Sequence, residues 1–401
     1  MSQDQNQSNR KKAYLGIVLL GIVSLLGDIV YEGSRGVVPD YLGFLGATAL
    51  IVGVIGGAGD FLGNAMRLVS GFLVDATRAY WFFIFLGYGL IVSIPFLGFS
   101  GGLEIAIVLV LLERLGKALR SPSRDTVLSI VSKDVGAGKA FGIHELLDQV
   151  GAVFGPLMVA ALMFYSNNNY RYTFSFLLIP FLGLLMALIY AYKKIGSKTT
   201  VELPRTKGEK GKLPKPFYLY TVAVLANTIG LIPYTLILFK ASVILMPLKQ
   251  DWIVPLIYVL IQGVDAPAAL LSGYAYDKFG IEVLALPFLL SLFPPLLAMI
   301  DSGLPILIVA AIFFGLVLGM QESIYRAAVS KLAPISSRGT AYGIFNTVYG
   351  VGFLISGAIY GLLMDYKLSF VVVGLYVCAM QAVALFSLFD VRSQLKRTDS
   401  L

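Results

Sequence analysis

The sequence predicts an all-α integral membrane protein, with twelve transmembrane helices in two pseudo-symmetric halves of six. The first observation is composition: 57% of the residues are hydrophobic and only 13% are charged, whereas a soluble domain is about half apolar and a quarter charged. The second is that apolar runs of about 20 residues, enough to cross a bilayer as a helix, recur from end to end. The third is that one short polar motif occurs twice, half a chain apart.

Each of the first six helices is expected as a long apolar run between polar or glycine-containing turns. The first run follows the basic residues RKK, the second ends before GFLVDATR, and the third ends at SGG. The fourth ends at SKDVG, the fifth starts at AFG, and the sixth lies between NNNYR and YKK. The expected ranges are 13–32, 44–70, 81–99, 104–132, 140–165 and 171–192.

The second half repeats this pattern in the same order. Its first helix follows LPKP, its second ends before GYAYDKFG, and its third ends before DSG. Its fourth ends at APISS, its fifth starts at TAYG, and its sixth follows DYK. The expected ranges are 217–239, 251–272, 282–300, 304–332, 340–364 and 369–389.

Residues 193–216 form a polar linker rich in Lys, Gly and Pro, and this linker is the only candidate domain boundary. We therefore predict one six-helix bundle over 1–192 and another over 217–401. Basic loop residues mark the cytoplasmic side of a membrane protein. The linker and the two tails hold most of them: Arg10, Lys11, Lys12, Lys193, Lys194, Lys198, Arg205, Lys207, Lys210, Lys212, Lys215, Arg392, Lys396 and Arg397. We predict a multi-pass cell-membrane protein with both termini cytoplasmic and a linker that favours anionic lipid headgroups.

Composition also excludes several classes of site. The single cysteine, Cys378, excludes an internal disulfide and a cysteine-based zinc site, and the single histidine, His144, excludes a multi-histidine metal centre. The net charge of +8 collects in loops, so it does not indicate nucleic-acid binding. The motif H-E-x-x-H does not occur. We expect no enzymatic activity, no cofactor and no resident metal. We also expect no cleavable signal peptide, because the apolar run Ala13–Val30 is too long for one.

The two copies of the repeated motif stand at equivalent places, each between the second and third expected helices of its half. GFLVDATR follows the second expected helix of the first half, and GYAYDKFG follows the second expected helix of the second half, so both are expected in cytoplasmic loops. A second pair of similar stretches lies at the start of the fifth helix of each half: AFGIHELLDQVG and AYGIFNTVYG. Two copies of a six-helix unit are a known transporter architecture, with the substrate site expected between the halves near mid-membrane.

The second copy of the motif resembles the signature G-x-x-x-D-(R/K)-x-G-(R/K)-(R/K) of the major facilitator superfamily (MFS) of transporters. Gly273, Asp277, Lys278 and Gly280 fit this signature up to its terminal basic pair, where Ile and Glu stand. The resemblance implies the twelve-helix fold of that superfamily, a small-molecule substrate and a monomeric protein.

The first copy departs further from the signature. Gly71 and Asp75 keep its core, but Ala76 replaces the basic residue and Arg78 stands where the last glycine belongs. In both copies the aspartate is expected to cap a helix N-terminus or to pair with an arginine at a cytoplasmic gate. The gate candidates are Gly71, Asp75, Arg78, Arg124, Asp125, His144, Gly273, Asp277 and Lys278.

Helix 5 carries Gly151, Gly155 and Pro156, which resemble the G-x-x-x-G-P element associated with proton-coupled exporters in that superfamily. Glycines four residues apart also allow close helix contact, and proline bends a helix. A role in packing alone is therefore the alternative.

Four longer stretches are similar to a prokaryotic branch described as MFS permeases. They are SLLGDIVYEGSRGVVPDYL, RLGKALRSPSRDTVLS, AFGIHELLDQVGAVFGP and GMQESIYRAAVSKLAPISSRGTAYGIF. The branch pairs two acids of helix 1 with a basic element of helix 4 and an F-G-x-H element of helix 5. Here these are Asp28 and Glu32; Arg120, Pro122, Arg124 and Asp125; and Phe141, Gly142 and His144. Drug, metal-ion and metal-chelate exporters have been assigned near this branch, so the resemblance implies transport without naming a substrate.

Charged residues inside the expected helices are functional candidates, because ionisable groups are costly in a membrane. A stripe of charge on helix 4 needs either a water-filled cavity or carboxylates on a neighbouring helix. We expect Asp28, Glu32 or Asp148 to carry protons, with Lys117 and Arg120 as the switching counter-ions. The other charge-network and substrate-cavity candidates are Glu113, Arg114, Glu145, Glu322 and Arg326.

Simpler interpretations compete with some of these roles. Glu322 and Arg326 stand four residues apart, so they can form an ion pair within one helix. His144 can be a hydrogen-bonded gate residue rather than a ligand. The aromatic residues of helices 7 and 11 can serve packing rather than line a binding site.

Three functions remain in view. The first is proton-driven export of a small amphipathic organic compound, in which the substrate competes with the proton. The second is transport of a metal ion, a metal chelate or an organic anion; Lys117 and Arg120 repel a bare divalent ion but suit an anion. The third is an intramembrane enzyme or a receptor, which the half-chain repeat and the lack of a sizeable soluble domain disfavour.

Overall fold

The computed structural model describes residues 3–196, 212–300, 303–334 and 337–399. Within these ranges the chain is helical and contains no strand. Ten helical stretches of the described residues are long and apolar enough to cross a membrane. One of them, Asp251–Met299, is 49 residues long and holds two crossings, and the charged helix α6 (Leu103–Val131) supplies a further one. The predicted all-α fold with twelve membrane helices is therefore confirmed.

The described residues divide into two compact units. The first contains residues 3–37 and 66–196, and the second contains residues 38–65 and 212–399. Most of the predicted linker, including Lys198, Arg205, Lys207 and Lys210, lies outside the described residues. The units differ from the predicted halves at residues 38–65, which belong to the second unit although they precede the linker.

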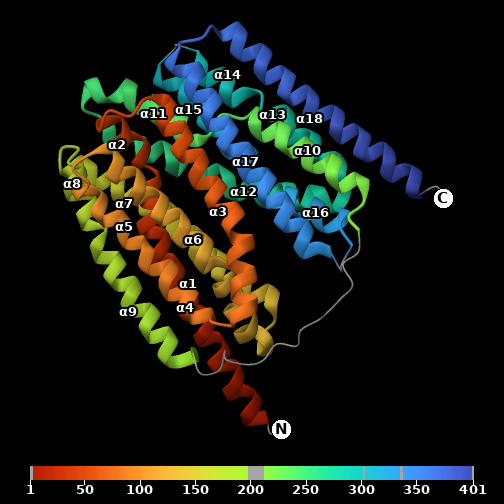
Figure 1. The fold of residues 1–401 in the computed structure, drawn as a ribbon. Helices are drawn as coiled ribbons and strands as arrows, with labels where there is room; N and C mark the ends of the chain where they lie inside the picture. Colours follow the sequence, from red (N-terminus) through yellow and green to blue (C-terminus); the bar gives the residue numbers. More distant parts are fainter. Residues whose placement is uncertain (1–2, 197–211, 301–302, 335–336, 400–401) are drawn as a thin grey trace. The chain divides into compact units, whose positions relative to one another are not determined.

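The first unit is built around α1 (Gln3–Arg35), which packs against α7 (Ala137–Tyr165) and α9 (Leu178–Ile195). Next to them α4 (Tyr80–Gly89) packs against α6 (Figure 1). The other α-helices of this unit are α5 (Ser93–Phe96), α8 (Tyr170–Phe176) and the last part of α3 (Ala49–Thr77). This arrangement brings the charged faces of α1, α6 and α7 together inside one unit.

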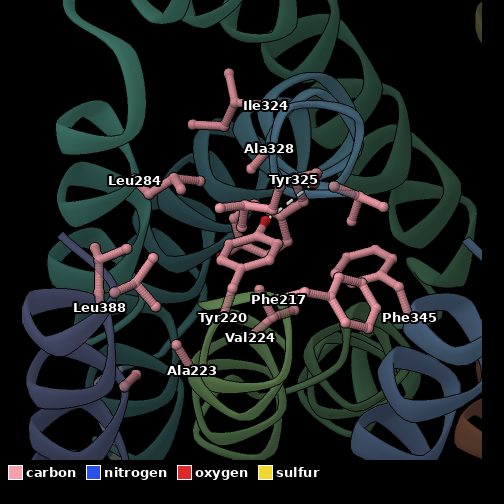
Figure 2. Packing of buried hydrophobic residues seen from close by; sticks show 14 of the residues in the cluster. Phe217, Tyr220, Ala223, Val224, Leu284, Ile324, Tyr325, Ala328, Phe345 and Leu388 are labelled. Carbon is pink, nitrogen blue, oxygen red and sulfur yellow. Dashed lines mark hydrogen bonds between the residues drawn. The ribbon is translucent and has the colours of Figure 1, made fainter. Parts of the chain in front are cut away.

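The second unit is built on three helix pairs: α12 with α15, α10 with α18, and α10 with α17. Its helices are α2 (Val38–Phe44), the first part of α3, α10 (Lys215–Ile229), α11 (Tyr234–Leu245), α12 (Val254–Phe279), α13 (Ala285–Leu290), α14 (Phe293–Met299), α15 (Leu304–Met320), α16 (Arg326–Leu332), α17 (Arg338–Asp365) and α18 (Phe370–Asp399). Figure 2 shows its apolar core, where Phe217 and Tyr220 of α10 lie close to Tyr325 and Phe345. The Tyr220 hydroxyl donates to the Tyr325 carbonyl at 3.0 Å, and the Tyr220 and Phe345 rings stack at 5.9 Å.

Glycines explain why the first part of α3 belongs to the second unit. A Cβ atom added to Gly53 would lie 2.1 Å from the carbonyl oxygen of Gly357 on α17, and one added to Gly357 would lie 2.0 Å from that of Gly53. The two backbones are therefore in direct contact. The Asp365 carboxylate, at the end of α17, also accepts hydrogen bonds from the backbone N–H groups of Ala49 (2.9 Å) and Leu50 (3.0 Å) at the start of α3. These contacts hold the start of α3 to the last part of α17.

The prediction that the two repeated motifs lie in loops is wrong, because both lie in the last turns of helices. α3 continues to Thr77 and α12 continues to Phe279. The residue directly after each helix is the last residue of the motif, Arg78 in the first copy and Gly280 in the second. Both have positive φ angles (56° and 70°). A positive φ is a common way to end a helix. The last glycine of the signature thus has a backbone role.

Several predicted helices are also interrupted: those over 81–99, 171–192 and 282–300 divide into shorter helices, and two further cases lie in the second unit. The helix expected over 217–239 divides into α10 and α11, with Gly230 and Pro233 in the break. The helix expected over 304–332 contains a π-helical turn, Gln321–Tyr325, between α15 and α16. Such turns occur frequently at functional sites.

Candidate functional site

The charged stripe of α6 faces α1 and α4 inside the first unit. Gly87 of α4 and Gly116 of α6 allow the two helices to approach, because a Cβ atom at Gly87 would lie 2.6 Å from the carbonyl oxygen of Gly116. Arg120 is buried in this contact, with 2% of its surface exposed. Its NH1 donates to the carbonyl of Gly87 at 3.4 Å.

Three cations surround the ring of Tyr31 on α1. Lys117 Nζ lies 4.6 Å from the ring centroid, and the guanidinium carbons of Arg35 and Arg120 each lie 4.9 Å from it. A cation within about 6 Å of an aromatic ring is attracted to its face. The Tyr31 ring therefore holds positive charges in a buried position, where their mutual repulsion would otherwise separate them.

Glu32 balances two of these cations. Its Oε1 lies 2.6 Å from Arg35 NH1 and 3.5 Å from Lys117 Nζ. The Glu32 side chain is 6% exposed, whereas that of Lys117 is 24% exposed. The ammonium group of Lys117 is therefore the more accessible partner of this ion pair.

Asp28 lies one turn before Glu32 and is 5% exposed. It interacts electrostatically with Lys117, Glu32 and Asp148. Gly151 of α7 packs directly against it, since a Cβ atom at Gly151 would lie 2.8 Å from Asp28 Cβ. The carboxylates of α1 and α7 are thus neighbours in the interior of the unit.

The Gly/Pro element of helix 5 makes a close contact with α1. A Cβ atom at Gly155 would lie 2.7 Å from the carbonyl oxygen of Ile29 and 2.9 Å from the backbone nitrogen of Gly33. These two glycines therefore serve packing.

Arg124 joins four helices at the predicted cytoplasmic end of the unit. Its NH1 donates to Ser24 Oγ of α1 at 2.9 Å and lies 3.6 Å from Asp148 Oδ2 of α7. Its Nε and NH2 donate to Asp125 Oδ1 at 3.0 and 2.9 Å. Ser24 Oγ in turn lies 3.3 Å from the hydroxyl of Tyr88 on α4.

His144 completes this group through Asp148, one turn further along α7. Its Nδ1 lies 3.5 Å from Asp148 Oδ2. The Nε2 atom of His144 and the Oδ1 atom of Asp148 are buried and have no hydrogen-bond partner. Buried polar atoms are nearly always hydrogen-bonded, so this pair needs an explanation beyond packing.

The other predicted residues are not members of this cluster. Glu113 and Arg114 are buried neighbours on α6, with 3.6 Å between Oε2 and Nε. Glu145 is exposed and accepts a hydrogen bond from Gln149. Six others are exposed: Asp75 and Arg78 at the end of α3, Asp277 and Lys278 at the end of α12, and Glu322 and Arg326 at the π-helical turn. Gly71 lies 4.0 Å from Pro122, and Gly273 lies 3.1 Å from Ser323, both measured from an added Cβ atom.

Sequence reasoning missed the uncharged members of the cluster, Ser24, Tyr31 and Tyr88. Tyr31 stands between Asp28 and Glu32 in helix 1. Its position directly before an intramembrane acid could have indicated that it belongs to the cluster. Tyr88 had no signal of this kind, because it reaches the cluster only through the tertiary contact of α4 with α6.

A second polar group, also missed, lies inside the second unit around Asn227 of α10. Its Oδ1 accepts from Gln321 Nε2 (3.1 Å) and from the Tyr325 hydroxyl (2.6 Å), the first and last residues of the π-helical turn. Its Nδ2 donates to Ser291 Oγ (3.0 Å) and to Gln381 Oε1 (2.8 Å). All four hydrogen-bonding positions of this amide are used, so the network fixes the π-helical turn. Polar amide side chains within apolar runs could have indicated this network in the sequence.

Among the described residues, no group of three or more His, Cys, Asp or Glu side chains is arranged to hold a metal ion. The charged cluster instead offers exchangeable ion pairs. Carboxylates that share arginine and lysine partners can take up a proton and release a cation for another ligand.

Comparisons with known proteins relate this architecture to transporters. The sequence model of the Major Facilitator Superfamily matches residues 17–357 and 254–400. An uncharacterized protein of Mycobacterium tuberculosis is 34% identical over 387 residues, which cover 95% of this chain and 93% of that protein. An uncharacterized MFS-type transporter of Methanocaldococcus jannaschii is 28% identical over 90% of this chain and 91% of its own.

Two solved transporter structures share the fold. The nucleoside transporter NupG superposes with a TM-score of 0.72 at 11% identity, covering 94% of this chain and 99% of that one. The peptide transporter POT superposes with a TM-score of 0.71 at 16% identity, covering 93% of both chains.

Proposed function

This chain belongs to the Major Facilitator Superfamily, and from that membership we propose that it exports a small amphipathic organic compound in exchange for protons, by alternating access. It is a membrane transporter of the MFS type, and its relatives and fold are those of transporters rather than enzymes. The exchanged ion, the direction and the class of compound are our proposals. We also propose that it acts as a monomer in the cell membrane, with both termini in the cytoplasm.

One observation carries the proton coupling: the Glu32 carboxylate lies between Arg35 and Lys117 in a nearly closed site. Adding a proton to Glu32 removes the charge that holds both cations. Asp28 and Asp148 supply two further carboxylates in electrostatic contact with this pair. Such a carboxylate can take up a proton on one side of the membrane and release it on the other, which is what coupling to a proton gradient requires.

Export follows from competition at these carboxylates. An amphipathic cation and a proton neutralise the same acidic groups, so binding of one favours release of the other. When the inward proton gradient loads the acids from outside, the cation leaves on that side. Exchange of this kind moves the compound out of the cell.

The three cations around Tyr31 favour a second candidate, an organic anion or an anionic metal chelate. An anion would bind Lys117 and Arg35 when Glu32 is protonated, so anion and proton would bind together rather than compete. The two candidates therefore predict opposite directions of proton movement relative to the compound. A bare divalent cation fits less well than a singly charged organic one, because its doubled charge doubles the repulsion from the same cations.

The test is proton flux in reconstituted vesicles that contain a pH-sensitive dye. N-methyl-4-phenylpyridinium, benzenesulfonate and ferric citrate are added in turn as an organic cation, an organic anion and a metal chelate. Export by exchange predicts that a gradient of the cation drives protons in the opposite direction. Proton movement in the same direction as benzenesulfonate or ferric citrate would establish the second candidate.

Protein-free vesicles measure the leak of each compound. If compounds cross only in the presence of the protein and the internal pH never changes, proton coupling is wrong and the charged cluster has a structural role.

A further inference from the structure

The first turn of α3 takes two of its hydrogen bonds from a distant helix. The first N–H groups of a helix have no partner inside it and need a cap. Thr48, directly before α3, caps one of them through its hydroxyl at 3.4 Å. The N–H groups of Ala49 and Leu50 instead donate to the carboxylate of Asp365, at 2.9 and 3.0 Å. A negative charge at a helix N-terminus is stabilising, so the end of α17 supplies part of the cap of α3.

Beyond this cap, the contact of α3 with α17 is made of backbone. A Cβ atom added to Gly57 would lie 2.5 Å from the carbonyl oxygen of Phe353 and 2.7 Å from the Cα atom of Leu354. The contact of Gly53 with Gly357 has the same character. At these positions the two helices meet without interlocking side chains. They can therefore separate there without any side chain changing its rotamer.

The same segment covers an unsatisfied hydroxyl on α11. A Cβ atom added to Gly56 of α3 would lie 2.5 Å from Thr235 Oγ1. This oxygen is buried and has no hydrogen-bond partner among the described residues. A buried polar group without a hydrogen bond is unfavourable, and separation from Gly56 would open the Thr235 hydroxyl to water. A cost of this kind favours a contact that opens over a permanent one.

Both compact units share α3. Residues 49–65 of this helix belong to the second unit and residues 66–77 to the first, and no proline interrupts it. In alternating access one half of a transporter moves against the other. A continuous helix that belongs to both units must then either bend or release one of its contacts. The contact with α17 is suited to release, because Asp365 is exposed and water can replace it as the cap of α3.

We propose that residues 38–65 are a gate on the predicted outer side of the membrane, and that Asp365 is the latch that holds this gate shut. In the structure the gate is closed, with α2 against α11 and the first part of α3 against α17. Opening breaks the two hydrogen bonds of Asp365, separates the glycine faces and exposes the Thr235 hydroxyl. The latch rests on the alternating access proposed above, and it holds for any exchanged ion or compound.

The distance between two spin labels, measured by double electron–electron resonance, tests the latch directly. The labels are attached at Phe44→Cys, at the end of α2, and at Leu368→Cys, after α17, in a protein that carries Cys378→Ser. Both labelled side chains are exposed. These labels report movement of the whole segment, since fraying of the first turn of α3 alone leaves α2 against α11.

We expect one dominant distance in the parent protein and a second, longer one when the gate opens. Asp365→Ala should raise the ratio of the longer to the shorter distance at least about tenfold, which corresponds to about 1.4 kcal/mol. Asp365→Asn keeps one accepting oxygen and should give an intermediate ratio. If Asp365→Ala does not fold, Asp365→Asn takes its place in the comparison with the control.

Asn169→Ala is the matched control. The Asn169 side chain caps α8 by accepting a hydrogen bond from the Tyr172 N–H at 3.0 Å. This cap also lies on the predicted outer side, but both of its residues belong to the first unit. Its loss should leave the distances unchanged. The latch is wrong if neither Asp365 variant changes the distances, or if Asn169→Ala changes them as much.

The proton-flux assay keeps the latch apart from the proposed function. A longer distance in Asp365→Ala, together with no proton flux in the wild type for any of the three compounds, would support the latch and contradict proton exchange. Proton flux in the wild type, together with distances that Asp365→Ala leaves unchanged, would overturn the latch alone. In that case α3 bends during transport and keeps its contact with α17.

Discussion

At the scale of single residues, the Glu32 carboxylate is the point at which charge balance in the first unit can change. It forms ion pairs with both Arg35 and Lys117. Glutamine at this position keeps the shape and removes the charge. We expect Glu32→Gln to reduce gradient-driven transport at least about tenfold, or about 1.4 kcal/mol, while exchange at equal pH continues.

Glu104→Gln is the control for this change. Glu104 lies in the first turn of α6 and is exposed, so its neutralisation should leave both transport modes unaltered. Full gradient-driven transport by Glu32→Gln, Asp28→Asn and Asp148→Asn, each tested singly in the dye-loaded vesicles, would remove the acids of this cluster from the coupling mechanism.

Asn227 is the residue on which the polar network of the second unit depends. Removing its amide leaves Gln321, Tyr325, Ser291 and Gln381 with buried groups that have lost a partner. We expect Asn227→Ala to lower the free energy of unfolding by about 2 kcal/mol, since one unsatisfied buried group costs about 1–3 kcal/mol. Reversible unfolding by dodecyl sulfate in mixed micelles measures it.

Thr221→Val is the matched variant on the same helix. The Thr221 hydroxyl bonds only the carbonyl of Phe217 in its own helix, at 2.9 Å, so its loss should cost less than about 1 kcal/mol. Equal costs for the two variants would mean that the network contributes no more to stability than a local hydrogen bond.

Single residues also show what the sequence can reveal about a site. The acids and bases of helices 1, 4 and 5 are recognisable because charge is rare in a membrane helix, and the structure brings Asp28, Glu32, Lys117 and Arg120 together. Tyr31 and Tyr88 carry no charge and resemble many other tyrosines of the chain. Their roles depend on which helices touch, which no local pattern encodes.

At the scale of helices, the end of α12 depends on a glycine. Gly280 has φ 70° and ψ −145°, a region that is nearly restricted to glycine and costs other residues about 1–3 kcal/mol. We expect Gly280→Ala to lower the free energy of unfolding by about that amount. Gly263→Ala, in the middle of the same helix with nothing within 4 Å of its added Cβ, should instead raise it by about 0.5–1 kcal/mol. Calorimetric or detergent unfolding of the pair is the measurement, and a neutral Gly280→Ala would contradict the backbone role.

The contact of α1 with α7 gives a second helix-scale prediction. Gly155→Ala would place a methyl group against the backbone of Ile29 and Gly33, and overpacking of this kind costs about 1–3 kcal/mol. Gly183→Ala, on α9, meets only the flexible side chain of Leu26, at 3.8 Å, and should be nearly neutral. A stable Gly155→Ala protein that has lost proton coupling would instead favour the functional interpretation of the Gly/Pro element.

Helix existence was predictable and helix interruptions were not. Apolar runs bounded by polar turns identify each crossing, because length and hydrophobicity are local properties. The break between α10 and α11 lies at residues 230–233, Gly-Leu-Ile-Pro. The glycine and proline indicate a break, but the apolar run continues through them and predicts one helix. The π-helical turn has no such signal, since it is fixed by Asn227 from a helix almost a hundred residues earlier.

At the scale of the whole molecule, the distribution of basic residues predicts the orientation in the membrane. With Cys378 replaced by serine, a single cysteine at Lys212 should react with a membrane-impermeant maleimide only from the cytoplasmic side. A single cysteine at Lys249, in a loop of opposite parity, should react only from outside. Labelling of intact cells and of inverted vesicles distinguishes the two, and the reverse pattern would invert the topology.

The half-chain repeat indicates two similar six-helix bundles, yet the compact units do not follow that division. Residues 38–65 belong to the second unit because α3 meets α17 backbone to backbone. Sequence periodicity indicates which face of a helix is apolar. It does not indicate which partner that face will meet, and here the partner lies some three hundred residues away along the chain.

The contact of Gly53 with Gly357 bears on how relatives of this protein should be compared. Neither position has room for a methyl group, so each admits one of the twenty amino acids for reasons of space alone. In an alignment of related transporters these glycines should be as invariant as the acids of the proposed coupling site. A search for functional residues by conservation would rank them equally with Asp28 and Glu32, and only the geometry distinguishes a position preserved for shape from one preserved for chemistry.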